Sequence, residues 1–371
     1  MRCRHCSKLV EDTFLDLGTT PPSNAYLTSN ALLRPEKCYP LRVKVCSNCW
    51  LVQTEDYAQA DELFSADYAY FSSTSTSWLA HAEHYAQTMI KELGLTQNSH
   101  VIEVASNDGY MLKNFVTAGI SCLGIEPTVS TAVAAEQLGI PVLREFFCET
   151  LGKKLASLGK QADLIAGNNV YAHVPDINDF TRGLKAALKP GGTITLEFPH
   201  LMQLLEHTQF DTVYHEHFSY LSLYTVSRIF KNADLRIWNV EQLSTHGGSL
   251  RVYGCHTNDL RQTNPLVNAQ LAEETQRGLQ NISTYKDFQA KANRVKNDLL
   301  AFLNKQKHVG SKVAAYGAAA KGNTLLNYAG VKTNLLPFVC DAAPSKQGKF
   351  MPGSHIPILP PSAMVEFNPD F

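Results

Sequence analysis

Residues 214–217 read Tyr-His-Glu-His and place a phenol, two imidazoles and a carboxylate at four consecutive positions. This is too much polar chemistry for a core element, and the aromatic Phe218 and Tyr220 that follow are unusual for a solvated turn. An imidazole with a near-neutral pKa can accept a proton at physiological pH, and a neighbouring carboxylate or phenol can support it. The segment therefore indicates a site of proton transfer.

Two other interpretations of this segment remain open. His215 and His217 could ligate iron or zinc from one face of a strand, although a third ligand in a distinct motif is not evident. The segment could also be a buried, hydrogen-bonded cluster without a catalytic role. Proton transfer is favoured over both, because a base, a carboxylate and a phenol are all present.

Four cysteines stand in two pairs of equal spacing, Cys3 with Cys6 and Cys46 with Cys49. Each two-residue turn can point both sulfurs at one ion, so the four thiolates predict a tetrahedral Zn²⁺ site. Four cysteines leave no open ligand position, which favours structural over catalytic zinc; unmetallated buried thiols are the alternative. The segment 19–45 is expected to form a hairpin with a loop excursion, and Cys38 to be a core residue.

The composition is that of an ordinary globular protein. Of 371 residues 44% are hydrophobic and 18% charged, and a net charge of −1 creates no field that attracts nucleic acid or an anionic membrane. The length predicts two or three domains. No apolar run reaches the roughly 18 to 20 residues of a transmembrane helix, and the start lacks a signal peptide's apolar core. A cytoplasmic protein with a small-molecule partner is expected, with neither nucleic acid nor membrane as partner.

Strand and helix patterns alternate in the middle of the chain. The expected strands are 100–104, 121–125, 162–166 and 192–197, and the expected helices are about 78–93, from 109 to about 118, and 177–188. This alternation predicts an α/β fold with a doubly wound parallel sheet. An antiparallel pair, 235–240 and 249–256, is expected around the turn His246-Gly247-Gly248.

A polar helical region from about 268 to 307 separates off a third unit. There the strand 312–316 runs into a small-residue loop, and the strand 336–340 ends at Asp341, which predicts a second βαβ nucleotide-type fold. The chain stops at 368–371, where a further strand would begin, so a truncated product is expected. The predicted domains are 1–77, 78–258 and 259–371.

The loop after the strand 100–104 has the features of an adenosine-cofactor pocket. Glu103 ends the strand, Gly109 permits a tight loop, and Glu126 ends the next strand, where an acid binds both ribose hydroxyls in dinucleotide folds. A dinucleotide needs three glycines for its pyrophosphate, but this loop has one glycine and two acids, Glu103 and Asp108. The acids suit a sulfonium and an amino group, so S-adenosylmethionine is favoured over NAD.

Two further segments support this cofactor. The turn Leu188-Lys189-Pro190-Gly191-Gly192 is common before the fifth strand of methyltransferase sheets, and Asn168 and Asn169 follow the strand that contributes cofactor and substrate contacts. A capped loop is the alternative for either asparagine. The predicted cofactor-binding residues are Glu103, Ala105, Ser106, Asn107, Asp108, Gly109, Glu126, Asn168 and Asn169.

Methyl transfer to carbon would require the chemistry that residues 214–217 offer. The carbon must first become a carbanion equivalent, and an adjacent ketone supplies this by holding the charge as an enolate. The protein must then provide a base of near-neutral pKa and a donor for the enolate oxygen.

Together these motifs resemble the sugar C-methyltransferases, which act on nucleotide-linked keto-deoxysugars and methylate C3 beside a C4 ketone. The resemblance covers nearly the whole chain. It rests on the four-cysteine unit, the Glu-x-Ala-Ser-Asn-Asp-Gly loop, Tyr-His-Glu-His-Phe-Ser-Tyr, and the Gly-Ala-x-Ala-Lys-Gly-x-Thr-Leu-Leu-Asn loop that begins at Gly317. It implies an N-terminal zinc-binding unit, a central Rossmann-like methyltransferase sheet and a second Rossmann-like domain at the C-terminus.

The resemblance also implies roles for individual residues. His217 would remove the C3 proton, Glu216 would support it, and Tyr214 would lie beside the sugar. A tyrosine of the N-terminal unit, Tyr70 with Tyr68 as the alternative, would reach into the active site. Cys3, Cys6, Cys46 and Cys49 would hold the zinc.

The loop from Gly317 has a physical interpretation of its own. Gly317, the alanines and Gly322 allow close backbone approach, the helix N-terminus favours anions, and Lys321 adds positive charge, so a sugar-nucleotide diphosphate could bind. Tight packing of a helix on a sheet would explain the small residues but not Lys321 and Lys346. The predicted substrate-binding residues are Gly317, Lys321, Thr324, Asn327, Asp341 and Lys346.

The sequence thus predicts a zinc-containing, S-adenosylmethionine-dependent C-methyltransferase of nucleotide-linked 4-keto-deoxyhexoses. One alternative is a nicotinamide-dependent sugar oxidoreductase with two nucleotide folds, against which the loop with one glycine and two acids argues. Another is a non-enzymatic zinc-ribbon protein that binds nucleotides, which would leave residues 215–217 without a function.

Overall fold

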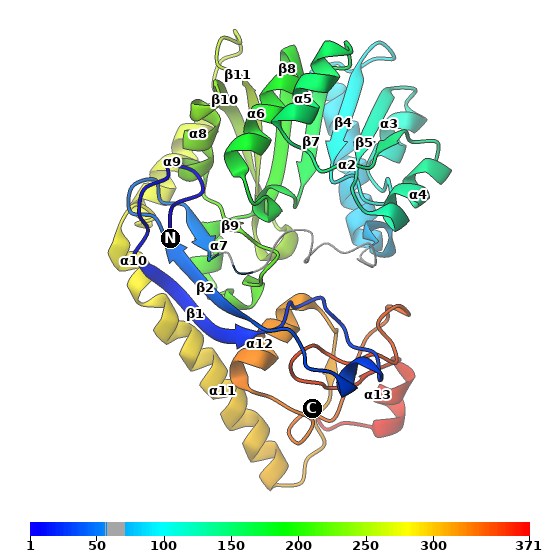
Figure 1. The fold of residues 1–371 in the computed structure, drawn as a ribbon, viewed down its shortest axis with the longest axis vertical. Coiled ribbons are helices and arrows are strands. Elements are labelled where there is room, and N and C mark those ends of the chain that lie inside the picture. Colours follow the sequence, from blue (N-terminus) through cyan, green and yellow to red (C-terminus); the bar gives the residue numbers. More distant parts are fainter. Residues whose placement is uncertain (56, 58–70) are drawn as a thin grey trace.

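The computed structural model describes residues 1–55, 57 and 71–371, and Figure 1 shows their arrangement. A large sheet with helices on both faces forms one part, and a smaller unit with the C-terminus lies across from it. The N-terminal strands run between the two. No helix within the described ranges is long and apolar enough to cross a lipid bilayer.

The N-terminal sheet has the strand order β1-β2-β3-β9, with antiparallel neighbours throughout. Its strands are β1 (Thr13–Thr20), β2 (Tyr39–Val45), β3 (Val52–Thr54) and β9 (Ser219–Tyr220). The expected hairpin with an excursion is confirmed, and the excursion carries the short helix η1 (Ala31–Leu33). Cys38 was expected in the core but is exposed, because it lies at the end of this excursion, just before β2 begins.

The central sheet has the order β10-β11-β8-β7-β4-β5-β6. Its strands are β4 (His100–Val104), β5 (Ser121–Ile125), β6 (Val142–Leu143), β7 (Ala162–Asn168), β8 (Leu188–Pro199), β10 (Leu235–Leu243) and β11 (Ser249–His256). Strands β4 to β8 are parallel, and β10 and β11 form the expected antiparallel pair at one edge. The turn that begins at Leu188 lies inside β8 as a bulge against β7, and it does not precede the strand.

Alternating strand residues face opposite layers of helices. Val101 packs with helices α2 (Thr76–Leu93), α3 (Leu112–Thr117) and α4 (Val129–Gln137) on one face. Its neighbour Ile102 packs with α5 (Glu149–Ser157), α6 (Ile177–Ala187) and α8 (Leu223–Asn232) on the other. Both faces are apolar because helices cover both, as parallel sheets require. The doubly wound α/β fold is therefore confirmed.

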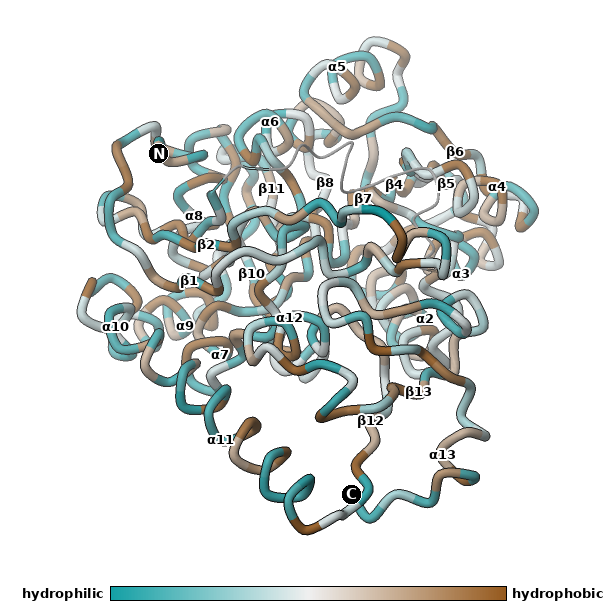
Figure 2. The backbone as a smooth tube through the Cα atoms, turned by 60° about the horizontal axis from the view of Figure 1, so that its bottom comes forward, coloured by the Kyte–Doolittle hydropathy of each residue, from teal (hydrophilic) through white to brown (hydrophobic). Residues whose placement is uncertain are grey.

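The remaining helices connect the sheets. The N-terminal sheet packs on α7 (Leu201–Glu206), α10 (Ile282–Lys286) and α11 (Phe288–His308), while α9 (Pro265–Gln276) packs on β10 and α8. Helix α11 runs from β1 to the C-terminal unit (Figure 1), and Figure 2 shows hydrophilic stretches interrupted by apolar turns along it.

The C-terminal unit contains three parallel strands of two residues each, β12 (Ala315–Tyr316), β13 (Val339–Cys340) and β14 (Ile358–Leu359). Two helices accompany them, α12 (Ala320–Ala329) and α13 (Ser362–Phe367). Strand and helix alternate as expected, but this small sheet does not confirm a second Rossmann-like domain. The last residues continue alongside 312–314, where the Ala314 amide donates to the Phe371 carbonyl.

Candidate active site

A cavity of about 820 Å³ opens at the carboxyl ends of the parallel strands, where ligands bind in open α/β sheets. All three parts of the chain line it: Asn24 comes from the N-terminal unit, Asn168 from the central sheet and Lys321 from α12. The predicted site residues that line this cavity are Ala105, Asn107, Glu126, Asn168, Asn169, Tyr214, Glu216, His217, Lys321 and Lys346.

The loop after β4 adopts a conformation that normally calls for glycine. Ala105, Asn107 and Gly109 all have positive φ, at 59°, 49° and 78°. Two of these three residues are not glycine, so the surrounding structure must impose the positive φ at Ala105 and Asn107. Each non-glycine residue at positive φ costs on the order of 1 kcal/mol, which the surrounding contacts must offset.

Glu126 secures this loop. One carboxylate oxygen accepts from the Asn107 amide at 3.0 Å and the other from the Thr128 amide at 2.8 Å. The Asn107 side chain in turn accepts from the Ser72 amide at 2.9 Å, just before α2. The loop is therefore held from both sides, and Glu126 still faces the cavity.

Several buried polar atoms around this loop have no hydrogen-bond partner among the described residues. They are Glu103 Oε1 and Oε2, Ser106 Oγ, Asp108 Oδ1, Asn168 Oδ1 and Asn169 Oδ1. Unpaired buried acceptors are costly, and of these residues Asn168 and Asn169 line the cavity, where a ligand with hydrogen-bond donors can reach them. An adenosine cofactor with an amino group is such a ligand. Burial raises the pKa of Glu103 well above its ordinary value.

The segment 214–217 is held by the zinc-binding unit. Strand β9 follows it directly and pairs with β3, Val52 opposite Tyr220. The Thr54 hydroxyl donates to the His217 carbonyl at 3.3 Å, and the Thr54 amide donates to the Phe218 carbonyl at 3.2 Å. The proton-transfer segment is therefore an extension of the N-terminal sheet, although more than 150 residues separate the two in sequence.

His217 is buried with one ring nitrogen committed. Its Nδ1–H donates to the Thr212 carbonyl at 3.0 Å, which leaves the Nε2 lone pair for another partner. The rings of Tyr214 and His173 flank it, with centroids 4.0 and 4.5 Å away. Burial lowers the pKa of His217 well below its ordinary value, so the imidazole is neutral at physiological pH.

Glu216 contacts the N-terminal unit as well as the cavity. Its Oε2 accepts from the Asn24 side-chain amide at 2.6 Å, and its carbonyl accepts from His173 Nδ1 at 2.8 Å. Burial raises the pKa of Glu216 to about 7 and lowers the pKa of His173 to about 4. A carboxyl group that titrates near neutrality can accept or donate a proton at working pH.

His215 faces away from the cavity. Its Nε2 donates to the Tyr39 carbonyl of β2 at 3.2 Å, so it fastens the segment to the N-terminal sheet. Within the described ranges, the four cysteines are the one gathering of three or more possible metal ligands. The metal interpretation of His215 and His217 therefore still has no third ligand.

The four cysteines do come together. Their four Sγ atoms all lie within 4.8 Å of one another. The side-chain Nε2 of Gln53 donates to Cys3 Sγ at 3.3 Å. Two turns thus present four sulfurs to one point, which is the arrangement that a tetrahedral zinc ion requires. The site has no remaining ligand position, as the spacing predicted.

The loop from Gly317 to Ala320 approaches the cavity from the C-terminal unit. Asp341 braces it, because one carboxylate oxygen accepts from the Ala318 amide at 2.7 Å and the other from the Ala343 amide at 2.8 Å. Lys346 Nζ donates to the Ala318 carbonyl at 2.8 Å and faces the cavity. Asp341 lies outside the cavity lining, so its expected contact with the substrate stays a prediction.

The other residues predicted for the substrate lie behind this loop. Thr324 Oγ1 donates to the Val213 carbonyl at 2.9 Å, and Asn327 Nδ2 donates to the Pro352 carbonyl at 3.1 Å. Neither they nor Gly317 line the cavity. Glu103, Ser106, Asp108 and Gly109 likewise sit under the cofactor loop, outside the lining. The predicted residues Tyr70 and Tyr68 fall outside the described residues.

Several cavity residues were not predicted from the sequence. They are Asn24, Trp78, Tyr110, Phe147, His173 and His246. The sequence held one indication for His173, because it follows the end of the same strand as Asn168 and Asn169. Asn24 had none, because it lies in a Pro- and Ser-containing excursion far from every motif.

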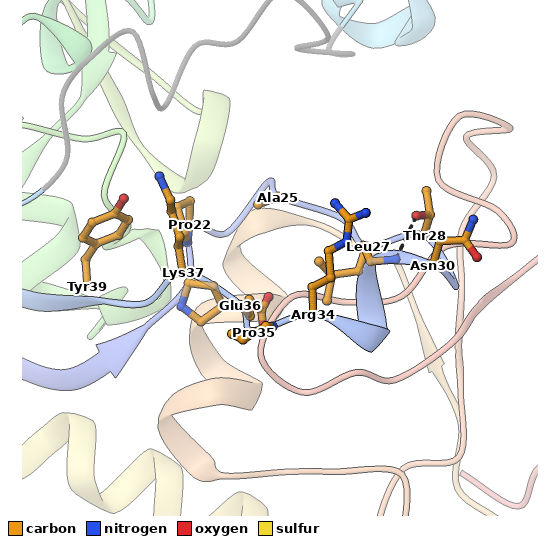
Figure 3. Close-up of a pocket in the computed structure, with 12 residues that line it drawn as sticks. Pro22, Ala25, Leu27, Thr28, Asn30, Arg34, Pro35, Glu36, Lys37 and Tyr39 are labelled. Carbon is orange, nitrogen blue, oxygen red and sulfur yellow. Dashed lines mark hydrogen bonds between the residues drawn. The ribbon is translucent and has the colours of Figure 1, made fainter.

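A second cavity, of about 510 Å³, lies in the excursion between β1 and β2 (Figure 3). Prolines and the side chains of Arg34, Lys37 and Tyr39 line it. Glu36 joins this wall to the C-terminal unit, because its carboxylate accepts from the Gly353 amide and from His355 Nε2, each at 3.0 Å. The excursion therefore connects the N-terminal and C-terminal parts of the chain.

Comparison with known proteins agrees with this architecture. Three family models match: "Putative zinc binding domain" over residues 3–64, "Methyltransferase domain" over 78–240 and "C-methyltransferase C-terminal domain" over 244–371. The C-methyltransferase NovU of Streptomyces niveus is 33% identical over 372 residues, which cover 100% of this chain and 88% of NovU. The chain belongs to this family of C-methyltransferases with an N-terminal zinc-binding domain.

Solved structures match part of this chain at low identity. The magnesium protoporphyrin IX methyltransferase of Synechocystis PCC 6803 with bound S-adenosylmethionine is 13% identical, with a TM-score of 0.37 over 47% of this chain and 78% of that chain. The PH0226 protein of Pyrococcus horikoshii is 13% identical, with a TM-score of 0.40 over 54% and 100%.

Family membership settles the class of reaction. The protein is an enzyme that transfers a methyl group from S-adenosylmethionine to carbon, and zinc is the metal of its N-terminal domain. The cavity residues Glu126, Asn168 and Asn169 and the four-sulfur cluster suit these two groups. The oxidoreductase and non-enzymatic alternatives are therefore set aside.

Proposed function

We propose that the enzyme methylates C3 of a nucleoside-diphosphate-linked 4-keto-deoxyhexose and that His217 removes the C3 proton. The geometry of His217 carries this proposal. The hydrogen bond from Nδ1 to the Thr212 carbonyl selects the tautomer with a lone pair on Nε2, and the ring lines the cavity. A buried, neutral imidazole of this tautomer is suited to act as a base.

His217 Nε2 takes the C3 proton, and the C–H electron pair moves into the C4 ketone as an enolate. The enolate carbon is then the nucleophile in the transfer. S-adenosylmethionine, when bound, would supply an electrophilic methyl carbon: the C3–methyl bond would form as the S–methyl bond breaks, S-adenosylhomocysteine would leave, and the C4 ketone would be restored. Residues of the loop after β4 and of 168–169 would hold this donor, while Glu216 and Tyr214 flank the base.

Two lysines support a diphosphate as part of the substrate. Lys321, at the start of α12, and Lys346 both line the cavity on the side of the C-terminal unit. The central sheet contributes acids to the lining, among them Glu126 and Glu145, so the cavity has one anionic and one cationic side. Such polarity would orient a cationic donor and an anionic sugar nucleotide toward each other.

Solvent exchange tests the assignment of the base. A C4 ketone acidifies the protons on both C3 and C5, so dTDP-4-keto-6-deoxyglucose in D₂O with S-adenosylhomocysteine should lose the C3 proton signal in the NMR spectrum. His217→Ala should abolish this exchange and bind S-adenosylhomocysteine as the wild type does. Exchange at C5 instead would contradict the position, and normal exchange by the variant would contradict the base.

A further inference from the structure

The turn between β10 and β11 places a strained histidine in the cavity. His246 has a φ of 55°, in the left-handed region that non-glycine residues rarely adopt, and it precedes Gly247 and Gly248, which also have positive φ. The side chain of His246 is exposed, and it lines the cavity. Strain of about 1 to 3 kcal/mol at such a residue persists only where the surroundings impose it, and such strain clusters at functional sites.

Three separate elements impose this conformation. Thr245 Oγ1 donates to Glu197 Oε1 of β8 at 2.9 Å, and Gln209 Nε2 donates to the Gly247 carbonyl at 2.7 Å. Lys321 Nζ donates to the His246 carbonyl at 3.5 Å from α12. Close packing adds to these contacts, because a Cβ atom at Gly247 would meet Gln209 Nε2 at 2.7 Å. The turn is therefore fixed around one imidazole.

The imidazole lies between the two ligand regions. On one side its ring packs at 80° to the ring of Trp78 in α2, with centroids 5.2 Å apart. The segment just before α2 contacts the loop after β4, because the Ser72 amide donates to the Asn107 side chain. On the other side is Lys321, which belongs to the proposed diphosphate region. No described residue forms a hydrogen bond with either ring nitrogen of His246, so the ring keeps its donor for a ligand.

The electrostatic surroundings keep this ring neutral. Although the residue as a whole is exposed, burial of its ring against the cavity wall lowers the pKa of His246; Glu197 opposes this shift, and Lys321 and His81 add to it. A neutral imidazole carries one N–H donor without adding a second charge next to Lys321.

We propose that His246 is a further catalytic residue, whose imidazole N–H donates a hydrogen bond to the substrate's ketone oxygen as the enolate forms. This inference rests on the proposed function, because it assigns the donor that C3 deprotonation requires beside the base. As His217 takes the proton, the electron pair reaches the ketone oxygen, and His246 stabilises the charge there. A hydrogen-bond donor that is already held in place stabilises the enolate charge more than a mobile donor does, because it does not have to reorient as the charge forms.

His246→Gly is the decisive variant, since glycine accepts a φ of 55° and removes only the imidazole. The solvent exchange of dTDP-4-keto-6-deoxyglucose in D₂O should slow by roughly 10²- to 10³-fold, the usual loss for one such donor. Added free imidazole should restore part of the rate, because the vacated space admits it. Affinity for S-adenosylhomocysteine, measured by calorimetry, and the melting temperature should match the wild type.

His207→Ala is the matched control, because it removes an exposed imidazole that does not line the cavity. The His207→Ala variant should exchange the substrate's C3 proton with solvent deuterium at the wild-type rate. Exchange by His246→Gly within about threefold of the wild type, or a loss explained by weaker S-adenosylhomocysteine binding, would overturn the role of His246. A wild-type protein that exchanges neither the C3 nor the C5 proton would instead overturn the proposed function itself.

Discussion

Glu216 and His217 are neighbours in the chain, and burial drives both toward their neutral forms. The pKa of the carboxyl group is raised to about 7, and that of the imidazole is lowered well below its ordinary value. Desolvation is the largest cause in each case, since neither group has an ion-pair partner among the described residues. His217 is therefore neutral before the reaction and can accept a proton, and Glu216 titrates near neutral pH beside it.

The raised pKa of Glu216 predicts a pH dependence of stability. The folded protein holds this proton up to about pH 7, whereas the unfolded chain releases it near pH 4. The stabilising contribution is therefore complete below about pH 4 and is lost as pH rises toward 7, by an amount of roughly 3 kcal/mol. Urea unfolding of Glu216→Gln and wild type between pH 5 and 8 should show the wild type losing stability relative to the variant.

The control for this experiment is Glu92→Gln, at an exposed position of α2. Its stability should follow that of the wild type at every pH. A stability difference between Glu216→Gln and wild type that does not change with pH would contradict the raised pKa.

At the scale of elements, the loop after β4 depends on its close packing against α4. A Cβ atom at Gly109 would lie 2.5 Å from Ile140 Cδ1 and 3.2 Å from Ala135 Cβ, in addition to the strain at its φ of 78°. Gly109→Ala should therefore destabilise the protein by roughly 2 to 4 kcal/mol and weaken S-adenosylhomocysteine binding.

Gly139→Ala isolates the packing contribution, because Gly139 has a φ of 76° and no atom lies within 4 Å of the place that a Cβ atom would take. It should lose only the backbone contribution, roughly 1 kcal/mol, and bind the cofactor normally. Equal destabilisation of the two variants in urea unfolding would show that packing at Gly109 does not matter.

The pairing of β3 with β9 makes the zinc unit a support for the proton-transfer segment. Gln53 contacts Cys3 through its side chain and pairs with Ser219 of β9, so loss of the metal should reach residues 214–220 through β3. Removal of zinc by a chelator should raise amide hydrogen exchange in peptides covering 214–222, because folding of this unit and metal binding are coupled. Exchange in β7 should stay unchanged.

Cys46→Ser should reproduce the effect of the chelator, whereas Cys38→Ser, at an exposed cysteine outside the cluster, should not. Unchanged exchange in 214–222 after confirmed loss of zinc would show that β9 is held without the metal. The readout is independent of activity, so a loss of turnover for another reason cannot imitate it.

At the scale of the whole molecule, the cavity separates charge between the central sheet and the C-terminal unit. Lys321→Met and Lys346→Met should each weaken binding of dTDP by roughly tenfold or more, because each removes a charge-assisted contact to phosphate. Calorimetry should show unchanged affinity for S-adenosylhomocysteine.

Lys349→Met is the matched control, since Lys349 belongs to the same loop as Lys346 but does not line the cavity. Its affinity for dTDP should equal that of the wild type. If all three variants bind dTDP equally well, the diphosphate lies elsewhere, and the cavity in the excursion between β1 and β2 becomes the next region to examine (Figure 3).

Local patterns were sufficient for much of the central sheet. Strands β4 and β5 begin and end at the predicted residues, because apolar runs bounded by turns define them without reference to the rest of the chain. The same holds for the start of α6 at Ile177, where Asp176 accepts from the Asp179 amide as its N-cap. Two strands of the C-terminal unit, β12 and β13, were predicted too long, since only two residues of each find partners, and β14 was not predicted.

By itself the sequence determined the two cysteine pairs, the acid-containing cofactor loop and the proton-transfer segment, because each is a short run whose chemistry follows from residue type and spacing. Only the tertiary structure decided which residues join them. Asn24 reaches Glu216, β9 joins the zinc unit's sheet, and His246 enters the cavity between two ligand regions. These contacts join residues far apart in the sequence, so they depend on how the elements pack, and no periodicity or local spacing encodes them.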